Sequence, residues 1–67
     1  MGSTKENIMA VALHLFAQKG YEAVSVSQIA GALGMTKGAL YRHYENKRDI
    51  FLHIVKRMEQ QDGEQAR

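Results

Sequence analysis

Cysteine and proline are both absent from this chain of 67 residues. Without cysteine, the chain has neither a disulfide framework nor a thiolate metal site, which is compatible with a reducing cytoplasm. Without proline, no helix is interrupted from within. Long apolar runs are missing as well, so we expect no membrane span, no signal peptide and a cytoplasmic protein.

Strong net charge is also missing, because the formal net charge is only +2. By itself this is weak evidence for a nucleic-acid partner. The distribution of charge is more informative: residues 36–48 hold four Lys and Arg side chains against the single acid Glu45. A chain of this length forms one small domain of marginal stability. We therefore expect a compact helical domain whose positive charge gathers over residues 36–48.

Residues 25–47 show the pattern of two short helices joined by a tight turn. Ser25 can cap the first helix, whose apolar positions follow the i, i+3, i+4, i+7 spacing from Val26 to Leu33. Gly34 can end that helix in the left-handed conformation, and Thr36 can cap the next one. The second helix, over about 36–44, spans about 13 Å, close to the major-groove width of about 12 Å. The pattern predicts a helix-turn-helix with 36–44 as its recognition helix.

A first helix precedes this motif. Ser3 and Glu6 fit a capping box, an apolar stripe runs over residues 8–16, and Gly20 follows the last helical residue. Residues 21–24 are expected to connect this helix to the motif without forming a strand. The first helix is therefore interpreted as scaffold.

A fourth helix follows the recognition helix. Asn46 can cap it, and Asp49 falls at its third position, where a carboxylate favours the free amides. Its apolar stripe runs over residues 50–58. We therefore expect residues 1–60 to form one all-α, homeodomain-like domain. It would contain a three-helix helix-turn-helix unit and a fourth, linking helix. Residues 61–67 are expected to form a polar, disordered tail.

The residues from Gly20 to Ile50 resemble the DNA-binding domain of the tetracycline-repressor (TetR) family of bacterial transcription regulators. The resemblance is carried by Phe16, Gly20, Ser25, Ile29, Ala30, Leu33, Gly34, Gly38, Leu40, Tyr41, His43, Tyr44 and Lys47. Two positions depart from the family pattern. Met35 stands where a smaller branched residue is commoner, and Ser27 stands where a basic residue often sits.

The resemblance implies sequence-specific DNA binding by a bacterial regulator, expected to be a repressor, on a pseudo-palindromic operator. It also implies a ligand-binding and dimerisation domain that these 67 residues do not contain. A small-molecule inducer would bind that missing domain, and a homodimer would need it. From these residues alone we expect a monomer with weak affinity for a double-stranded DNA operator, without enzymatic activity or cofactor. The operator sequence and the regulated genes are not specified.

Candidate DNA contacts follow from side-chain chemistry. Lys37 can donate to guanine, Ala39 can contact a thymine methyl group, and Gly38 allows close approach of the backbone. Donors suited to phosphate oxygens are Ser25, Ser27, Gln28, Thr36, Tyr41, His43 and Lys47. Arg42 is expected to point either to DNA or to solvent.

Other interpretations remain for some of these residues. Tyr44 is expected to pack against its neighbours with its hydroxyl in water, whereas Tyr41 is expected to contact DNA. A metal or catalytic site would use His43, His53 and Asp49, but an exposed i, i+4 pair of Asp49 and His53 is the simpler account. The main alternative is a small helical protein-interaction module without DNA binding, which predicts binding that is insensitive to salt.

Overall fold

The described part of the chain is entirely helical. The computed structural model describes the backbone of residues 3–65 and the side chains of residues 3–60. In chain order, the elements are α1 Thr4–Lys19, the 3₁₀ helix η1 Tyr21–Ala23, α2 Val26–Ala32, α3 Lys37–Tyr41 and α4 Lys47–Gln65. This confirms the expected all-α fold with a helix-turn-helix and a fourth helix.

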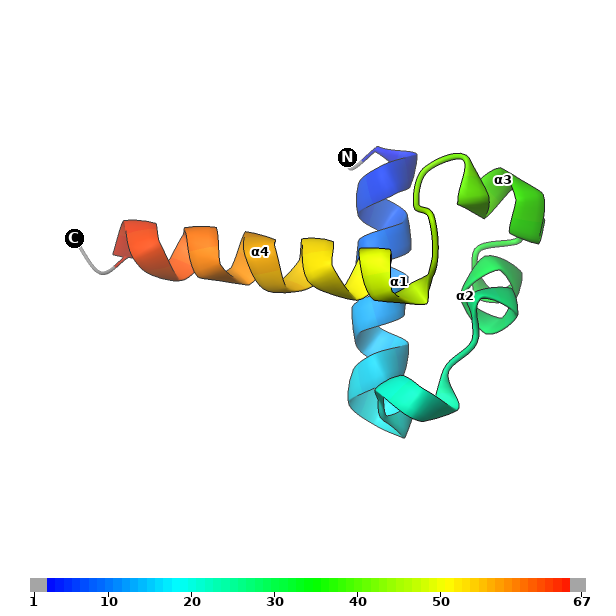
Figure 1. Cartoon of the computed structure of the whole chain (residues 1–67), viewed down its shortest axis with the longest axis horizontal. Helices are drawn as coiled ribbons and strands as arrows, with labels where there is room; N and C mark the ends of the chain where they lie inside the picture. Colours follow the sequence, from blue (N-terminus) through cyan, green and yellow to red (C-terminus); the bar gives the residue numbers. More distant parts are fainter. Residues whose placement is uncertain (1–2, 66–67) are drawn as a thin grey trace.

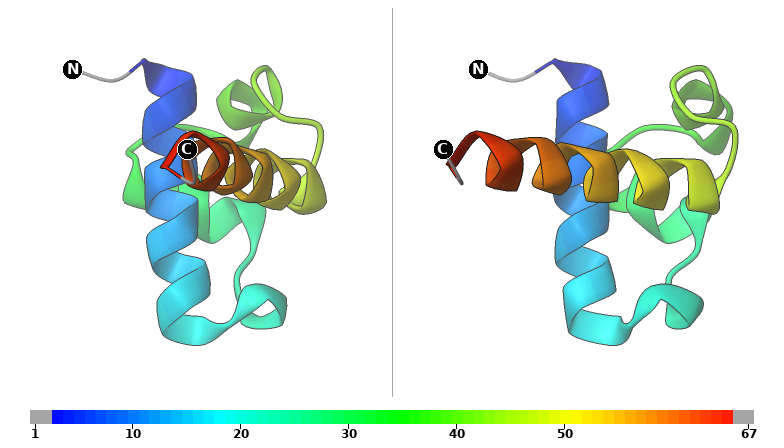
Figure 2. Two further views of the ribbon diagram at one scale, coloured as in Figure 1. Left: turned by 90° about the vertical axis from the view of Figure 1, so that its left-hand side faces the viewer. Right: turned by 60° about the vertical axis from the view of Figure 1, so that its left-hand side comes forward.

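The helices are arranged around the crossing of α1 and α4. Figure 1 shows α4 packed across α1, with α2 and α3 on one side of the crossing. The C-terminal part of α4 extends away from the other helices, as the right-hand view of Figure 2 also shows. α1 and the N-terminal turns of α4 therefore form the support on which the helix-turn-helix packs.

The ends of α1 follow the sequence pattern closely. The Glu6 amide donates to Ser3 Oγ at 3.2 Å, and Gly20 adopts a φ of 90° while its amide donates to the Phe16 carbonyl at 2.8 Å. Only this half of the expected capping box at Ser3 is confirmed. The Glu6 carboxylate instead accepts from Arg57 Nη1 at 3.0 Å, because α4 brings that guanidinium to it.

The connector after α1 is a single 3₁₀ turn, so the expectation of a connector rather than a strand is confirmed. The Val24 amide donates to the Tyr21 carbonyl at 3.3 Å, and the Val24 side chain is buried. The Tyr21 ring packs against two phenylalanines, with centroids 5.3 Å from Phe16 and 5.1 Å from Phe51. This aromatic cluster holds the connector against α1 and α4.

The helix-turn-helix itself differs from expectation mainly in the length of its second helix. Gly34 adopts the left-handed conformation with a φ of 69°, as expected, and the turn between the helices covers residues 33–36. α3 ends at Tyr41 instead of continuing to Tyr44. The prediction of a helix over 36–44 was too long, because the chain leaves the helical path and buries Tyr44 against the core.

The start of α4 is capped as predicted. Asn46 Oδ1 accepts from the Asp49 amide at 2.8 Å, and Asp49 Oδ2 accepts from the Glu45 amide at 3.0 Å. The backbone of α4 is helical through Gln65. The disordered tail expected over 61–67 stays a prediction, since side chains after residue 60 and the placement of residues 66 and 67 lie outside the described residues.

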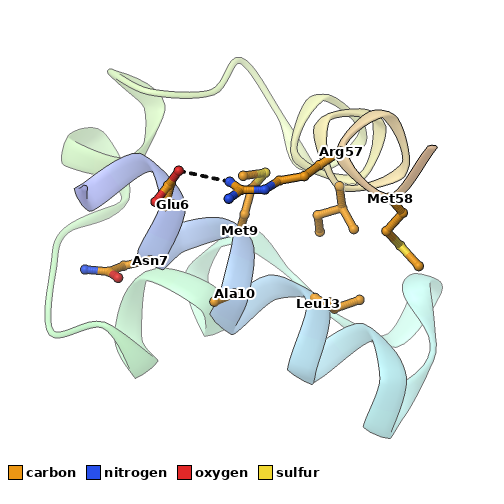
Figure 3. Close-up of a pocket in the computed structure, with 8 residues that line it drawn as sticks. Glu6, Asn7, Met9, Ala10, Leu13, Arg57 and Met58 are labelled. Atoms are coloured by element: carbon orange, nitrogen blue, oxygen red, sulfur yellow. Dashed lines mark hydrogen bonds and ion pairs between the residues drawn. The ribbon is translucent and has the colours of Figure 1, made fainter. Parts of the chain in front are cut away.

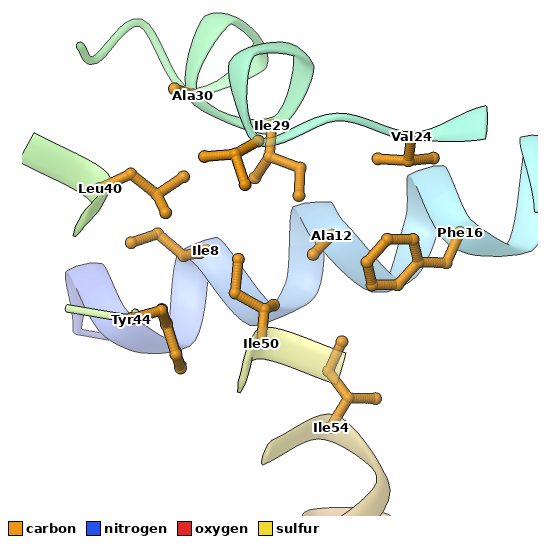
Figure 4. Packing of buried hydrophobic residues seen from close by; sticks show 11 residues of the cluster. Ile8, Ala12, Phe16, Val24, Ile29, Ala30, Leu40, Tyr44, Ile50 and Ile54 are labelled. Atoms are coloured by element: carbon orange, nitrogen blue, oxygen red, sulfur yellow. The ribbon is translucent and has the colours of Figure 1, made fainter. Parts of the chain in front are cut away.

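The core lies where α1, α2, α3 and α4 meet (Figure 4). Its buried members are Ile8, Ala12, Phe16, Val24, Val26, Ile29, Ala30, Leu40, Tyr44, Ile50 and Ile54. Full burial of a large apolar side chain stabilises the fold by about 1.5–3 kcal/mol. The apolar stripe expected along α4 is buried only at Ile50 and Ile54. Phe51 and Met58 are 38% and 51% exposed, because α4 crosses α1 and only one face of it reaches the core.

Candidate nucleic-acid interface

α3 is held in place by one side chain. Leu40 is fully buried, while Lys37 and Gly38 are exposed and Tyr41 is 43% exposed. Ala39 is half-buried. Most of the surface of α3 is therefore free to contact a partner.

Gly38 lies on this free surface without an internal packing role. A Cβ atom added at this position would meet no other atom within 4 Å. A glycine inside a helix is less stable than alanine by roughly 0.5–1 kcal/mol. The fold therefore does not require glycine at position 38.

Three of the predicted phosphate donors also cap helices. Ser25 Oγ accepts from the Gln28 amide at 3.1 Å, and Gln28 Oε1 accepts from the Ser25 amide at 3.2 Å. Thr36 Oγ1 accepts from the Ala39 amide at 3.1 Å. These caps use the oxygen atoms as acceptors, so the hydroxyl protons and the Gln28 amide group remain available as donors. The caps also fix where these donors lie.

The predicted contact residues differ in exposure. Those that are exposed are Ser25, Ser27, Gln28, Thr36, Lys37, Gly38, Tyr41 and Arg42. Those that are half-buried are Ala39, His43 and Lys47. They come from the first turn of α2, from α3 and the turn after it, and from the first residue of α4. α2 and α3 pack directly against each other.

Lys47 makes contacts that the sequence did not indicate. Its Nζ donates to the Tyr21 carbonyl at 2.8 Å and lies 4.2 Å from the centroid of the Tyr21 ring. The neighbouring Arg48, which the sequence reasoning left out of the contact set, is exposed. The sequence signal for including Arg48 was its positive charge close to Asn46, the predicted cap of the fourth helix.

Tyr44 packs in the core as predicted, but its hydroxyl does not lie in water. The side chain is 2% exposed, and its hydroxyl donates to the Lys5 carbonyl at 3.0 Å. Burial raises the pKa of Tyr44, the Asp49 carboxylate raises it further, and Arg57 opposes this. Tyr44 is thus a buried structural residue that links the segment after α3 to α1.

Asp49 and His53, which were considered for a metal site, form an i, i+4 pair on α4. His53 Nδ1 lies 2.8 Å from the Asp49 carbonyl oxygen and 3.3 Å from Asp49 Oδ1. Both side chains are partly exposed, which confirms the expected i, i+4 pair. Among the described residues, no three His, Asp or Glu side chains come together as a metal ion would require.

A groove of about 400 Å³ lies between α1 and α4, away from α3 (Figure 3). It is lined by Glu6, Asn7, Met9, Ala10, Leu13, Ile54, Arg57 and Met58. The Glu6–Arg57 ion pair borders an otherwise largely apolar lining. None of the residues that line this groove was part of the predicted DNA interface.

A short helix with an exposed polar surface, joined by a left-handed glycine turn to a second helix, defines a helix-turn-helix domain. Residues 8–54 match the model of the bacterial regulatory proteins of the tetR family. The chain therefore belongs to the TetR family.

Curated relatives agree with this assignment. The chain is 43% identical over 61 residues to the HTH-type transcriptional regulator AcrR of Shigella flexneri, covering 91% of this chain and 28% of AcrR. It is 44% identical over 48 residues to the transposon Tn10 TetC protein of Escherichia coli, covering 72% and 24%. It is 33% identical over 55 residues to the HTH-type transcriptional repressor AcnR of Corynebacterium jeikeium, covering 82% and 29%.

AcrR and AcnR are named as a transcriptional regulator and a transcriptional repressor, a class distinct from enzymes. The chain spans between a quarter and a third of the length of AcrR and AcnR, and slightly less of TetC. Among the described residues, no helix has the length and apolar content needed to cross a membrane.

Proposed function

We propose that this domain binds double-stranded DNA by placing α3 in the major groove. The observation that carries this proposal is the anchoring of α3 through Leu40 alone, which leaves Lys37, Gly38 and Tyr41 exposed. A helix that enters a groove must be attached by one side and free on the others. α3 meets that requirement.

Individual residues take separate roles in the proposed complex. Lys37 donates to guanine O6 or N7, and Ala39 contacts a thymine methyl group. Gly38 lets the backbone of α3 approach the base edges. Thr36, Tyr41 and His43 donate to phosphate oxygens on one side of the groove.

The first turn of α2 contacts the phosphate backbone in this proposal. Ser25 and Gln28 use the hydroxyl and amide hydrogens that their capping box leaves free, and Ser27 adds a third donor. Arg42 and Arg48 are exposed and contribute positive charge near the same surface. Such contacts set register and orientation without reading sequence.

At the level of the whole regulator, we propose repression in the bacterial cytoplasm through a pseudo-palindromic operator bound by a homodimer. Support for repression comes from AcnR, which is named a repressor. A dimerisation domain and its small-molecule inducer site would lie outside these 67 residues. The 67-residue chain alone is then a monomer with weak operator affinity, because dimerisation doubles the contacts.

The test is a proton–nitrogen NMR titration of the labelled chain with a random-sequence duplex at low and high salt. DNA binding predicts shifts at the amides of 25–28 and 36–44 at low salt, and their reversal at high salt. Stationary amides at low salt would contradict DNA binding.

A matched pair of variants sharpens this test. Arg42→Ala should weaken binding to the random duplex and reduce the slope of log K against log salt by about 0.9, because its exposed cation is proposed to lie near the phosphate backbone. Lys56→Ala removes an exposed cation from α4 and should change neither quantity. Equal effects of the two substitutions would mean that DNA is attracted by positive charge anywhere on the protein. The proposed placement of α3 in the groove would then not be supported.

A second candidate function is protein interaction, favoured by the groove between α1 and α4. Met58 and Leu13, which line it, are 51% and 44% exposed. The same titration separates the candidates, since DNA is not expected to shift the groove amides. A partner bound in the groove should shift the amides of Met9, Leu13 and Met58 with little dependence on salt.

A further inference from the structure

We infer that Lys47 is a positioning residue, which holds the start of α2 in place through Tyr21 instead of contacting a phosphate group. This inference rests on the proposed DNA binding and names a residue that prepares the phosphate-contacting turn. It departs from the sequence-based expectation for Lys47.

The Lys47 ammonium group is already occupied inside the protein. Its Nζ lies 2.8 Å from the Tyr21 carbonyl oxygen and 4.2 Å from the Tyr21 ring centroid, and the side chain is half-buried. An ammonium group facing both a carbonyl and an aromatic ring gains a hydrogen bond and a cation–π contact at once. Leaving for a phosphate would forfeit both.

The position of Lys47 in α4 explains why it needs this partner. It is the first residue after the Asn46 cap, where the helix presents free amides and the positive end of its dipole. A cation is unfavourable at that end unless an acceptor lies nearby. The Tyr21 carbonyl supplies the acceptor, and the ring is fixed by Phe16 and Phe51.

The link reaches α2 through one shared carbonyl group. The Tyr21 oxygen accepts from Lys47 Nζ and also from the amide of Val24, at 3.3 Å. Both acceptor positions of this oxygen are thereby used. Val24 is buried and directly precedes Ser25, the cap of α2.

Loss of the ammonium group should therefore move the first turn of α2. Ser25, Ser27 and Gln28 are the proposed phosphate donors of that turn. Hydrogen bonds weaken once donor and acceptor move outside about 2.7–3.2 Å, so a small displacement is sufficient to weaken DNA binding. The number of phosphate groups that the protein neutralises with cations would not change.

The first experiment uses the free protein. Lys47→Met keeps an apolar stem against the Tyr21 ring and removes the donor, while Lys56→Met changes an exposed cation on the same helix. Proton–nitrogen spectra of Lys47→Met should show shifts over residues 21–28. Lys56→Met should leave those amides in place. Unshifted amides over 21–28 in Lys47→Met would overturn the inference, whether or not the protein binds DNA.

The second experiment measures affinity for a random duplex between 50 and 200 mM salt, a range chosen because phosphate contacts change affinity strongly within it. As a positioning residue, Lys47→Met should lower affinity by about fivefold, the effect of about one hydrogen bond. The slope of log K against log salt should stay that of the unmodified chain. A phosphate contact would instead reduce the slope by about 0.9, and that result would overturn the inference.

Rescue by arginine completes the test. Lys47→Arg keeps a donor for the Tyr21 carbonyl and a planar cation for its ring, so it should restore both affinity and the spectrum over 21–28. Failure of arginine to restore either would overturn the inference. If the unmodified chain binds no DNA while Lys47→Met still shifts residues 21–28, the proposed function fails and the structural link stands.

Discussion

The hydroxyl of Tyr44 donates a hydrogen bond to the backbone carbonyl of Lys5, 39 positions earlier in the sequence, at 3.0 Å. Lys5 Nζ also lies 5.4 Å from the centroid of the Tyr44 ring. The contact ties the segment that follows α3 to the first turns of α1. It also satisfies a polar group that would otherwise be buried without a partner.

Removal of this hydroxyl should lower the stability of the fold. We expect Tyr44→Phe to reduce the free energy of unfolding by about 1 kcal/mol, because the hydrogen bond to the Lys5 carbonyl is lost while the ring stays packed. Urea denaturation followed by circular dichroism measures the change. Tyr41→Phe is the control, since Tyr41 is 43% exposed and should unfold at the same urea concentration as the unmodified chain. Equal stability of the two variants would contradict a structural role for the hydroxyl.

Tyr44 should also make the free energy of unfolding depend on pH in the alkaline range. Burial raises the pKa of Tyr44, with a further increase from Asp49 and a smaller one from Glu6, while Arg57 lowers it. An unfolded tyrosine has a pKa of about 10. Above that pH the unfolded chain releases this proton before the folded chain does, so unfolding is increasingly favoured. The contribution is fully present below about pH 10 and is lost as pH rises towards the higher folded pKa.

The measurement compares the unmodified chain with Tyr44→Phe between pH 8 and 11, since this interval brackets the tyrosine pKa. Other groups titrate in both proteins, so the difference between the two curves isolates Tyr44. The difference should shrink as pH rises above about 10. A constant difference across the interval would show that the folded pKa of Tyr44 is not raised.

The sequence predicted the local features of this fold well. The caps at Ser25, Thr36 and Asn46 and the turn at Gly34 were all recognisable, because each depends on residues within four positions of one another. The family pattern added the order of the helices.

Contacts between distant segments could not be predicted in this way. Tyr44–Lys5, Lys47–Tyr21 and Glu6–Arg57 join residues 39, 26 and 51 positions apart. They depend on how α4 crosses α1. The crossing angle of two helices cannot be deduced from the periodicity of apolar residues within each helix. The same crossing explains why part of the α4 stripe is exposed. The DNA contacts themselves stay predictions.

Two glycines around the end of α2 should respond oppositely to alanine. Gly34 has a φ of 69°, where a side chain is strained, so Gly34→Ala should destabilise the fold by about 1 kcal/mol. Gly31 lies within α2, and a Cβ there would meet nothing within 4 Å. Gly31→Ala should stabilise by about 0.4–1 kcal/mol, since it reduces the entropy of the unfolded chain.

Thermal unfolding of the two variants tests this pair. The substitution is chemically identical at both positions, so a difference in sign can only come from backbone conformation and its surroundings. Stabilisation by Gly34→Ala would show that the left-handed turn is not maintained in solution. Destabilisation by Gly31→Ala would show that the surface of α2 is covered by something that the extra methyl group disturbs.

The ion pair between Glu6 and Arg57 should contribute little to stability despite its short distance. Its Oε2 and Nη1 atoms are 3.0 Å apart, but the side chains are 47% and 48% exposed. Water and salt screen such a pair, and ordering two long side chains opposes it, so we expect a coupling of about 0.2–1 kcal/mol. A double-mutant cycle with Glu6→Gln and Arg57→Gln measures this coupling, which should fall as salt is added. A coupling above about 2 kcal/mol that persists in salt would mean that α1 and α4 are held by a shielded charge pair. The apolar contacts of Ile50 and Ile54 would then no longer be the main attachment of α4 to the core.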